Sequence, residues 1–247
     1  GKMGHTKNFF ERKNGWSRQK DEILDRYLVP YIAKILGTYK PLVVIDCFAG
    51  KGRFDDGSTG SPIIIANHIR SVLESDKENK NIRGLFIESN YSRELETNLR
   101  GYKNCEILHW TFKENIDKIL ALDSRYNLFL YVDPYGIKCL DFQQFERITA
   151  KKFSSLEMIL NFNYLGFLRE GCRLLELDYE AIFSDDQSDD EYELNETNTI
   201  ELMNNIAHGE YWQSIIHDRK NKIIDVLKAE ELFINEYMKQ IKNLFTY

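Results

Sequence analysis

The fold is decided by the stretch Leu42-Val43-Val44-Ile45-Asp46-Cys47-Phe48-Ala49-Gly50-Lys51-Gly52. Its first four residues form a short continuous apolar run, which is typical of a strand that is buried on both faces. The two glycines permit a tight turn and a close approach of the backbone to a ligand. The third glycine of a dinucleotide-binding GxGxxG pattern is missing, and no Gly-Lys-Ser or Gly-Lys-Thr marks a P-loop. The stretch therefore predicts a first strand that leads into a ligand-binding turn.

Working outward, apolar strands alternate with amphipathic helices as far as about residue 165. We expect helices over 17–36, from Pro62 onward, and over 91–100, 113–122 and 141–150. Pro30 should kink or split the first of these helices. Further strands are expected over 84–88, 107–108, 128–132 and 158–160. This alternation predicts an α/β fold over residues 17–165, a Rossmann-like, doubly wound parallel sheet with helices on both faces.

The remaining residues, 166–247, are expected to form a helical extension, with helices over 199–207 and 220–244. It contains a segment, 185–196, with seven acids and no base, which favours a solvated loop, or alternatively a contact surface. Without those seven charges the net charge changes from −6 to +1. The N-terminal arm, residues 1–16, is basic and carries Phe9, Phe10 and Trp16. Such an arm could grip nucleic-acid phosphates and stack on bases, or its aromatic side chains could dock on the core.

Composition excludes several other classes of protein. No apolar stretch reaches the length of about 18 residues that a membrane helix needs, so we expect no membrane partner. The four cysteines occur in no metal-binding spacing and the five histidines are scattered. We therefore predict reduced thiols in a cytoplasmic protein and no metal site.

Three predicted strands end in residues suited to ligand chemistry, and ligands of doubly wound folds bind at the carboxyl ends of strands. Asp46 ends the first strand. Glu88 ends the second, where an acid can accept both hydroxyls of a ribose, although it could also simply cap a helix. Asp133-Pro134-Tyr135-Gly136 follows the clearest strand. There a carboxylate and a carbonyl could accept protons from an attacking amine, and Tyr135 could stack on an extruded base. The alternative is an Asp-Pro turn that only ends the strand.

Two of these motifs resemble those of S-adenosylmethionine (SAM) methyltransferases. The Asp46–Gly52 string resembles the nucleoside-binding turn of methyltransferases that act on amino groups. The resemblance implies that Asp46 and the Gly50–Gly52 backbone face the methionine end of SAM, with Phe48 walling the pocket beside Ala49. Asp133-Pro134-Tyr135-Gly136 resembles the [DN]-P-P-[YF] signature of adenine-N6 and cytosine-N4 methyltransferases, although the second proline is absent and a glycine follows. D-P-[FY]-G also occurs in transfer-RNA guanine-N2 methyltransferases, so the base identity stays open.

The chain as a whole resembles the three-Cys-motif partner proteins of bacteria (TcmP). The similarity covers about residues 9–165, with a weak match at Trp212. Besides the motifs above, the matching positions are Phe9, Phe10, Trp16, Ser17, Lys20, Leu24, Tyr27, Leu28, Gly60, Ser61 and Pro62. The resemblance implies a methyltransferase-type fold and a partner protein that carries a three-cysteine motif of the radical-SAM type. The family name records a neighbour rather than a reaction.

The sequence thus predicts a SAM-dependent methyltransferase acting on an exocyclic amine, with nucleic acid as the expected substrate. The alternative is a non-catalytic methyltransferase-like module that serves a three-Cys-motif protein. An NAD-binding oxidoreductase is disfavoured by the missing third glycine. A methyltransferase sheet usually ends in a hairpin after its fifth strand, and here only Leu244–Tyr247 is strand-like. Either the sheet is shortened or the chain stops before the hairpin, and we expect the second.

Overall fold

The computed structural model describes residues 15–183 and 198–245, which form two compact units. The first unit contains the residues up to Asp133 together with Lys151–Asn161, and the second contains Pro134–Ala150 together with the chain from Phe162 onward. Segment 134–150, which the sequence assigned to the Rossmann-like domain, thus packs with the helical extension. Residues 1–14 of the predicted basic arm and the acidic segment 185–196 lie outside the described residues.

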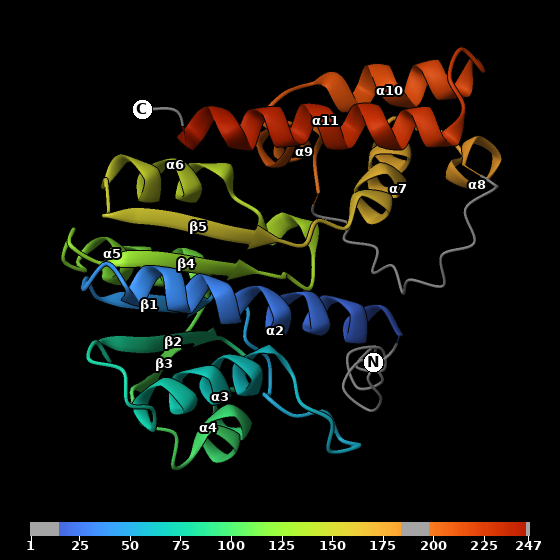
Figure 1. Cartoon of the computed structure of the whole chain (residues 1–247). Coiled ribbons are helices and arrows are strands. Elements are labelled where there is room, and N and C mark those ends of the chain that lie inside the picture. Colours follow the sequence, from blue (N-terminus) through green and yellow to red (C-terminus); the bar gives the residue numbers. More distant parts are fainter. Residues whose placement is uncertain (1–14, 184–197, 246–247) are drawn as a thin grey trace. The chain divides into compact units, whose positions relative to one another are not determined.

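The first unit is built on a five-stranded sheet, whose strands are all parallel and stand in the order β3-β2-β1-β4-β5. The strands are β1 (Leu42–Asp46), β2 (Ile82–Glu88), β3 (Cys105–His109), β4 (Asn127–Val132) and β5 (Ser155–Leu160). Every residue of β1 and β4 is buried, which explains their unbroken apolar runs. The predicted Rossmann-like α/β fold is confirmed (Figure 1).

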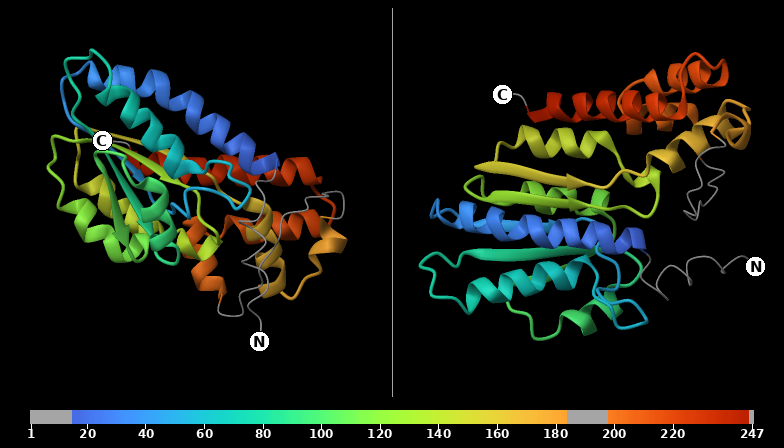
Figure 2. Two further views of the ribbon diagram at one scale, coloured as in Figure 1. Left: turned by 90° about the horizontal axis from the view of Figure 1, so that it is seen from below. Right: turned by 45° about the vertical axis from the view of Figure 1, so that its right-hand side comes forward.

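Helices cover both faces of this sheet. On one face lie α2 (Gly15–Leu36), α3 (Ser61–Leu73) and α4 (Ser92–Leu99), whose apolar side chains form one core with alternate residues of the strands. The other face carries α5 (Phe112–Leu120). Figure 2 shows α2 and α3 together on one side of the strands. Of the two outcomes expected at Pro30, a kink or a split, the split does not occur. The proline is exposed, and buried residues on both sides of it, such as Leu28 and Tyr31, hold a single helix against the sheet.

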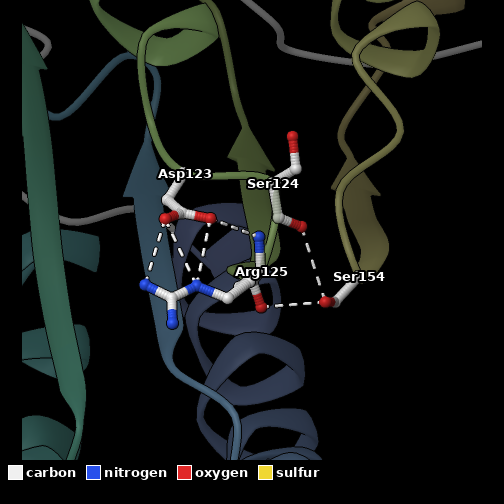
Figure 3. A network of polar contacts seen from close by, with 4 residues as sticks. All are labelled: Asp123, Ser124, Arg125 and Ser154. Carbon is white, nitrogen blue, oxygen red and sulfur yellow. Dashed lines mark hydrogen bonds and ion pairs between the residues drawn. The ribbon is translucent and has the colours of Figure 1, made fainter.

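Local polar contacts fasten the loops before β4 and β5 at the amino-terminal edge of the sheet (Figure 3). The Ser154 hydroxyl donates to the Arg125 carbonyl at 2.8 Å. The Asp123 carboxylate accepts the Arg125 backbone N–H at 2.9 Å. It also accepts three bonds from the Arg125 guanidinium, two at 3.3 Å from Nε and one at 3.1 Å from Nη2. The Arg125 N–H, followed by its side chain, lowers the pKa of Asp123. These contacts lie at the amino-terminal edge, whereas the predicted acids Asp46, Glu88 and Asp133 lie at the opposite edge.

The second unit is helical. It contains a short 3-10 helix, η1 (Ile137–Cys139), and α6 (Phe142–Ala150), α7 (Tyr164–Leu174), α8 (Tyr179–Ile182), α9 (Ile200–Ala207), α10 (Tyr211–Lys220) and α11 (Val226–Phe245). Trp212 is fully buried at its centre, edge-on to Phe167. The expected helix over 220–244 begins only at Val226, because α10 ends at Lys220 and the chain turns at Lys222, whose φ is +57°.

The prediction that Leu244–Tyr247 is strand-like is also wrong for the two of these residues that the structure describes. Leu244 and Phe245 end α11, and Thr246 and Tyr247 lie outside the described residues. Within residues 15–183 and 198–245 the five parallel strands make up the whole sheet. No helix in these ranges has the length and the hydropathy that crossing a membrane requires.

Candidate functional site at the carboxyl ends of the strands

The turn after β1 has the shape that its glycines predict. Gly50 and Gly52 both lie in the left-handed region, with φ of +75° and +88°. The turn is fixed to its surroundings by backbone bonds, from Ala49 N–H to the Ile87 carbonyl at 2.9 Å and from Gly60 N–H to the Gly52 carbonyl at 2.8 Å. A Cβ at position 52 would lie 3.2 Å from Leu95 Cδ1 of α4. The backbone conformation therefore favours glycine at position 52, and a larger residue would also displace the Leu95 side chain by a few tenths of an ångström.

Register explains why the acids of β1 and β2 meet. Asp46 lies beside Phe86 of β2 and Tyr131 of β4. Glu88 follows Phe86 by two residues, and side chains two apart on a strand point to the same face. Asp133 is the first residue after β4. The three acids therefore reach the same edge of the sheet, as the sequence predicted for strand ends.

Glu88 is almost completely buried, and it holds the turn in place. Its Oε2 accepts the Gly50 N–H at 2.6 Å, and its Oε1 accepts the N–H groups of Asn90 at 2.9 Å and Tyr91 at 3.2 Å. The carboxylate thus connects the glycine turn to the residues just before α4. It is not the exposed capping acid of the alternative interpretation, and contact with a ribose stays a prediction.

Asp46 is fully buried, and only one of its two carboxyl oxygens has a side-chain hydrogen-bond partner among the described residues. Its Oδ2 accepts the Ser61 hydroxyl at 2.7 Å, whereas its Oδ1 has no hydrogen-bond partner among the described residues. Burial raises its pKa to about 8, and the nearby charges of Asp133 and Glu88 act in the same direction. The Ser61 hydroxyl and the Phe48 backbone oppose the rise in pKa. At neutral pH this carboxyl is therefore mostly protonated.

Asp133 forms an ion pair that sequence reasoning missed. Lys20, in the second turn of α2, donates from Nζ to Asp133 Oδ1 at 3.1 Å. Burial raises the pKa of Asp133, and the charge and hydrogen bond of Lys20 oppose that rise. Lys20 is one of the matching positions of the family resemblance, but no local pattern assigns it a partner more than 100 residues away in the chain.

Tyr131 adds a buried phenol to this edge. Its hydroxyl accepts a hydrogen bond from Asn161 Nδ2 at 3.1 Å. Burial raises the pKa of Tyr131, and the charges of Asp133 and Asp46 raise it further. Tyr131 was predicted only as part of a strand, because an aromatic residue in an apolar run gives no sign that its hydroxyl lies near two carboxylates.

The remaining predicted site residues differ in their burial and in the unit to which they belong. Ala49 is buried and Phe48 is partly buried, with its ring centroid 5.9 Å from that of Phe112. Pro134, Tyr135 and Gly136 carry the chain into the second unit. The Tyr135 side chain is 50% exposed, which leaves it accessible for stacking.

Trp110 is a further candidate that the sequence interpretation missed. It follows His109, the residue of β3 that lies beside Glu88, and its side chain is 67% exposed. Its φ is +77°, a conformation that is uncommon for a bulky residue and that marks strain. The next residue, Thr111, forms a capping box with Glu114 that starts α5. The feature of the sequence that could have identified Trp110 is an aromatic residue between the end of a strand and the cap of the next helix.

Acidic residues thus gather at the carboxyl ends of β2, β1 and β4, and an exposed indole follows β3. Searches against protein-family models, curated proteins and solved structures find no significant match to this chain.

Proposed function

We propose that this chain is a SAM-dependent methyltransferase that acts on an exocyclic amine of a nucleic-acid base. One observation carries the proposal: Asp46, Glu88 and Asp133 gather around a glycine turn at the point where the strand order reverses. In sheets of this kind, the neighbouring strands β1 and β4 flank the crevice that binds ligands.

The charge of this edge favours SAM over a dinucleotide. SAM is positively charged at its sulfonium and its ammonium, and it carries no phosphate. A dinucleotide needs free backbone N–H groups for its pyrophosphate. Here the Gly50 N–H is bound to Glu88, and Asp46 adds a second acid at the same turn. The Glu88 carboxylate at this turn would repel a pyrophosphate, which supports a ligand without phosphate groups.

The residues at this edge suit the parts of SAM. Asp46 and the Gly50–Gly52 turn would hold its methionine end, Glu88 its ribose and Trp110 the face of its adenine. When bound, SAM supplies an activated methyl group, which leaves sulfur for the nitrogen of the acceptor. The role of the protein is to hold that nitrogen in line and to accept the proton that it loses.

Asp133 is the proposed proton acceptor. Lys20 favours its ionised form, in which it can accept a proton, while burial keeps its pKa above the ordinary range for aspartate. The carboxylate thereby becomes a better base than an exposed aspartate. Tyr135 would provide the stacking surface for the base that carries the amine.

The first test is calorimetric titration of the chain with SAM and, separately, with NAD. We expect SAM to bind and NAD not to bind. Trp110→Ala should weaken SAM binding about 10-fold, the loss expected for one stacking contact. Tyr39→Ala is the matched control, because Tyr39 is also an exposed aromatic residue with positive φ but lies before β1, at the opposite edge. Equal weakening by both variants, or binding of NAD alone, would reject the cofactor assignment.

The second test separates catalysis from binding. Asp133→Asn should keep SAM affinity within about 3-fold and lower methyl transfer to DNA or RNA by about 100-fold or more. Loss of both properties would assign Asp133 to the fold instead. SAM binding without transfer to any nucleic acid, together with co-purification of a cysteine-rich partner, would favour the non-catalytic module.

A further inference from the structure

We propose that Asp46 is a proton-exchange group: its buried carboxyl is neutral in the ligand-free protein and ionises when a cationic group of the ligand lies against Oδ1. Cofactor binding then releases a proton to solvent. This inference rests on the proposed cofactor, and it adds a pH dependence and a charge requirement to the same site.

One oxygen of Asp46 is buried without a hydrogen-bond partner. Oδ2 is held by the Ser61 hydroxyl at 2.7 Å, at the first residue of α3. Oδ1 is buried and has no partner. An unsatisfied buried acceptor is costly, and in native proteins such an atom requires an explanation. Because Asp46 is fully buried, a ligand donor would satisfy this oxygen once the residues that cover it at the carboxyl edge move aside.

The groups that face Asp46 from each packed element are mostly acidic or neutral. Glu88 lies at the end of β2, Asp133 follows β4, and both charges raise the pKa of Asp46. Tyr131 of β4 is an un-ionised phenol. Of the nearby cations, Lys20 Nζ contacts Asp133 Oδ1 at 3.1 Å, and Lys51 Nζ lies 3.7 Å from Asp55 Oδ1.

No ion pair therefore connects a cation to Asp46 within the part of the chain that the structure describes. A buried carboxylate without a cation is strongly disfavoured, so the carboxyl keeps its proton. A bound cation supplies the missing charge and reverses that balance. The proton leaves Asp46, the carboxylate pairs with the ligand, and no other reactant is consumed.

Proton release is measured by calorimetry of SAM binding at pH 7 in phosphate and in Tris, whose heats of ionisation differ. With a pKa of about 8, Asp46 carries about 0.9 proton at pH 7, so SAM binding should release close to 0.9 proton per protein molecule. Observed affinity should weaken by about 10-fold for each pH unit below pH 8. A ligand amine that binds as ammonium takes up protons instead, and this opposite contribution is common to all variants.

Two variants tie the release to Asp46. Asp46→Asn should bind SAM without net proton release and with little pH dependence between pH 6 and 8. Ser61→Ala removes a hydrogen bond that lowers the pKa of Asp46, so it should move the midpoint of the affinity profile to higher pH. A purely structural role for either residue would lower affinity equally at every pH.

Three ligands identify the cationic group. S-Adenosylhomocysteine lacks the sulfonium charge but keeps the ammonium, whereas 5′-methylthioadenosine lacks both. Release with SAM and S-adenosylhomocysteine assigns the ammonium, and release with SAM alone assigns the sulfonium. SAM binding with no proton release, or with the same release in Asp46→Asn, overturns this inference and leaves the cofactor assignment intact. Absence of SAM binding at any pH from 6 to 9 rejects both.

Discussion

Replacing Glu88 by glutamine should destabilise the first unit, because the structure uses both oxygens of this carboxylate as acceptors. Three backbone N–H groups donate to it, at 2.6 Å from Gly50, 2.9 Å from Asn90 and 3.2 Å from Tyr91. A glutamine amide has one oxygen and one NH2 group. Whichever way it is oriented, the NH2 group faces at least one of these N–H donors.

The cost follows from the best orientation of that amide. If its oxygen keeps the bonds from Asn90 and Tyr91, the NH2 group opposes the buried Gly50 N–H. One charge-assisted bond is lost and one buried donor is unsatisfied, which costs about 2–4 kcal/mol in the free energy of unfolding. For a urea slope of about 2 kcal/mol/M, the midpoint should fall by about 1–2 M.

Urea denaturation, monitored by hydrogen exchange of the backbone amides of residues 42–52, measures this loss of stability in the first unit itself. The matched control is Glu106→Gln in the neighbouring strand β3, whose carboxylate forms an exposed 3.3 Å pair with Arg83. That change should cost at most about 0.5 kcal/mol. A Glu88→Gln protein as stable as the control would refute the conclusion that Glu88 holds the turn.

Three further changes have defined outcomes. Gly52→Ala places a side chain at a φ of +88° and should lower unfolding free energy by about 1–3 kcal/mol in urea titration. Lys20→Met removes the charge that opposes the raised pKa of Asp133, so carbon-13 NMR should show that carboxyl titrating at higher pH, and an unchanged titration would contradict the pairing. Tyr27→Phe removes a 2.6 Å bond to Glu157 and should cost about 1 kcal/mol below pH 10. Because the pKa of Tyr27 is raised from 10.0 to about 12, wild-type protein should lose this advantage as the pH rises through that range, and thermal unfolding at several pH values checks it.

The Glu88 result also affects how the cofactor site is tested. Removal of this acid would disturb the glycine turn whether or not the acid binds a ribose. A loss of SAM affinity in a Glu88 variant therefore cannot by itself assign the contact. Trp110 is the better probe, because its side chain is 67% exposed and its loss leaves the turn intact.

The sequence by itself determined which segments form strands and which form helices over most of the first unit. The apolar run over Leu42–Ile45 has the composition of a strand buried on both faces, and β1 is buried throughout. Alternation of such runs with helices predicts a parallel sheet, since parallel strands need crossover connections. The acids at the strand ends followed from the same pattern, because every carboxyl end of a parallel sheet lies at one edge.

Only the tertiary structure decided what those acids contact. Lys20 meets Asp133 because α2 packs on the sheet beside β4, and Glu88 meets Gly50 because β2 pairs with β1 in one register. Local sequence encodes side-chain periodicity over a few residues, whereas these contacts depend on strand order and on how helices lie on the sheet. The unpartnered oxygen of Asp46 has the same origin. From the sequence alone, an aspartate after an apolar run gives no sign that its carboxyl is buried without a cationic partner. This burial arises only when segments that are far apart in the chain pack around the carboxyl.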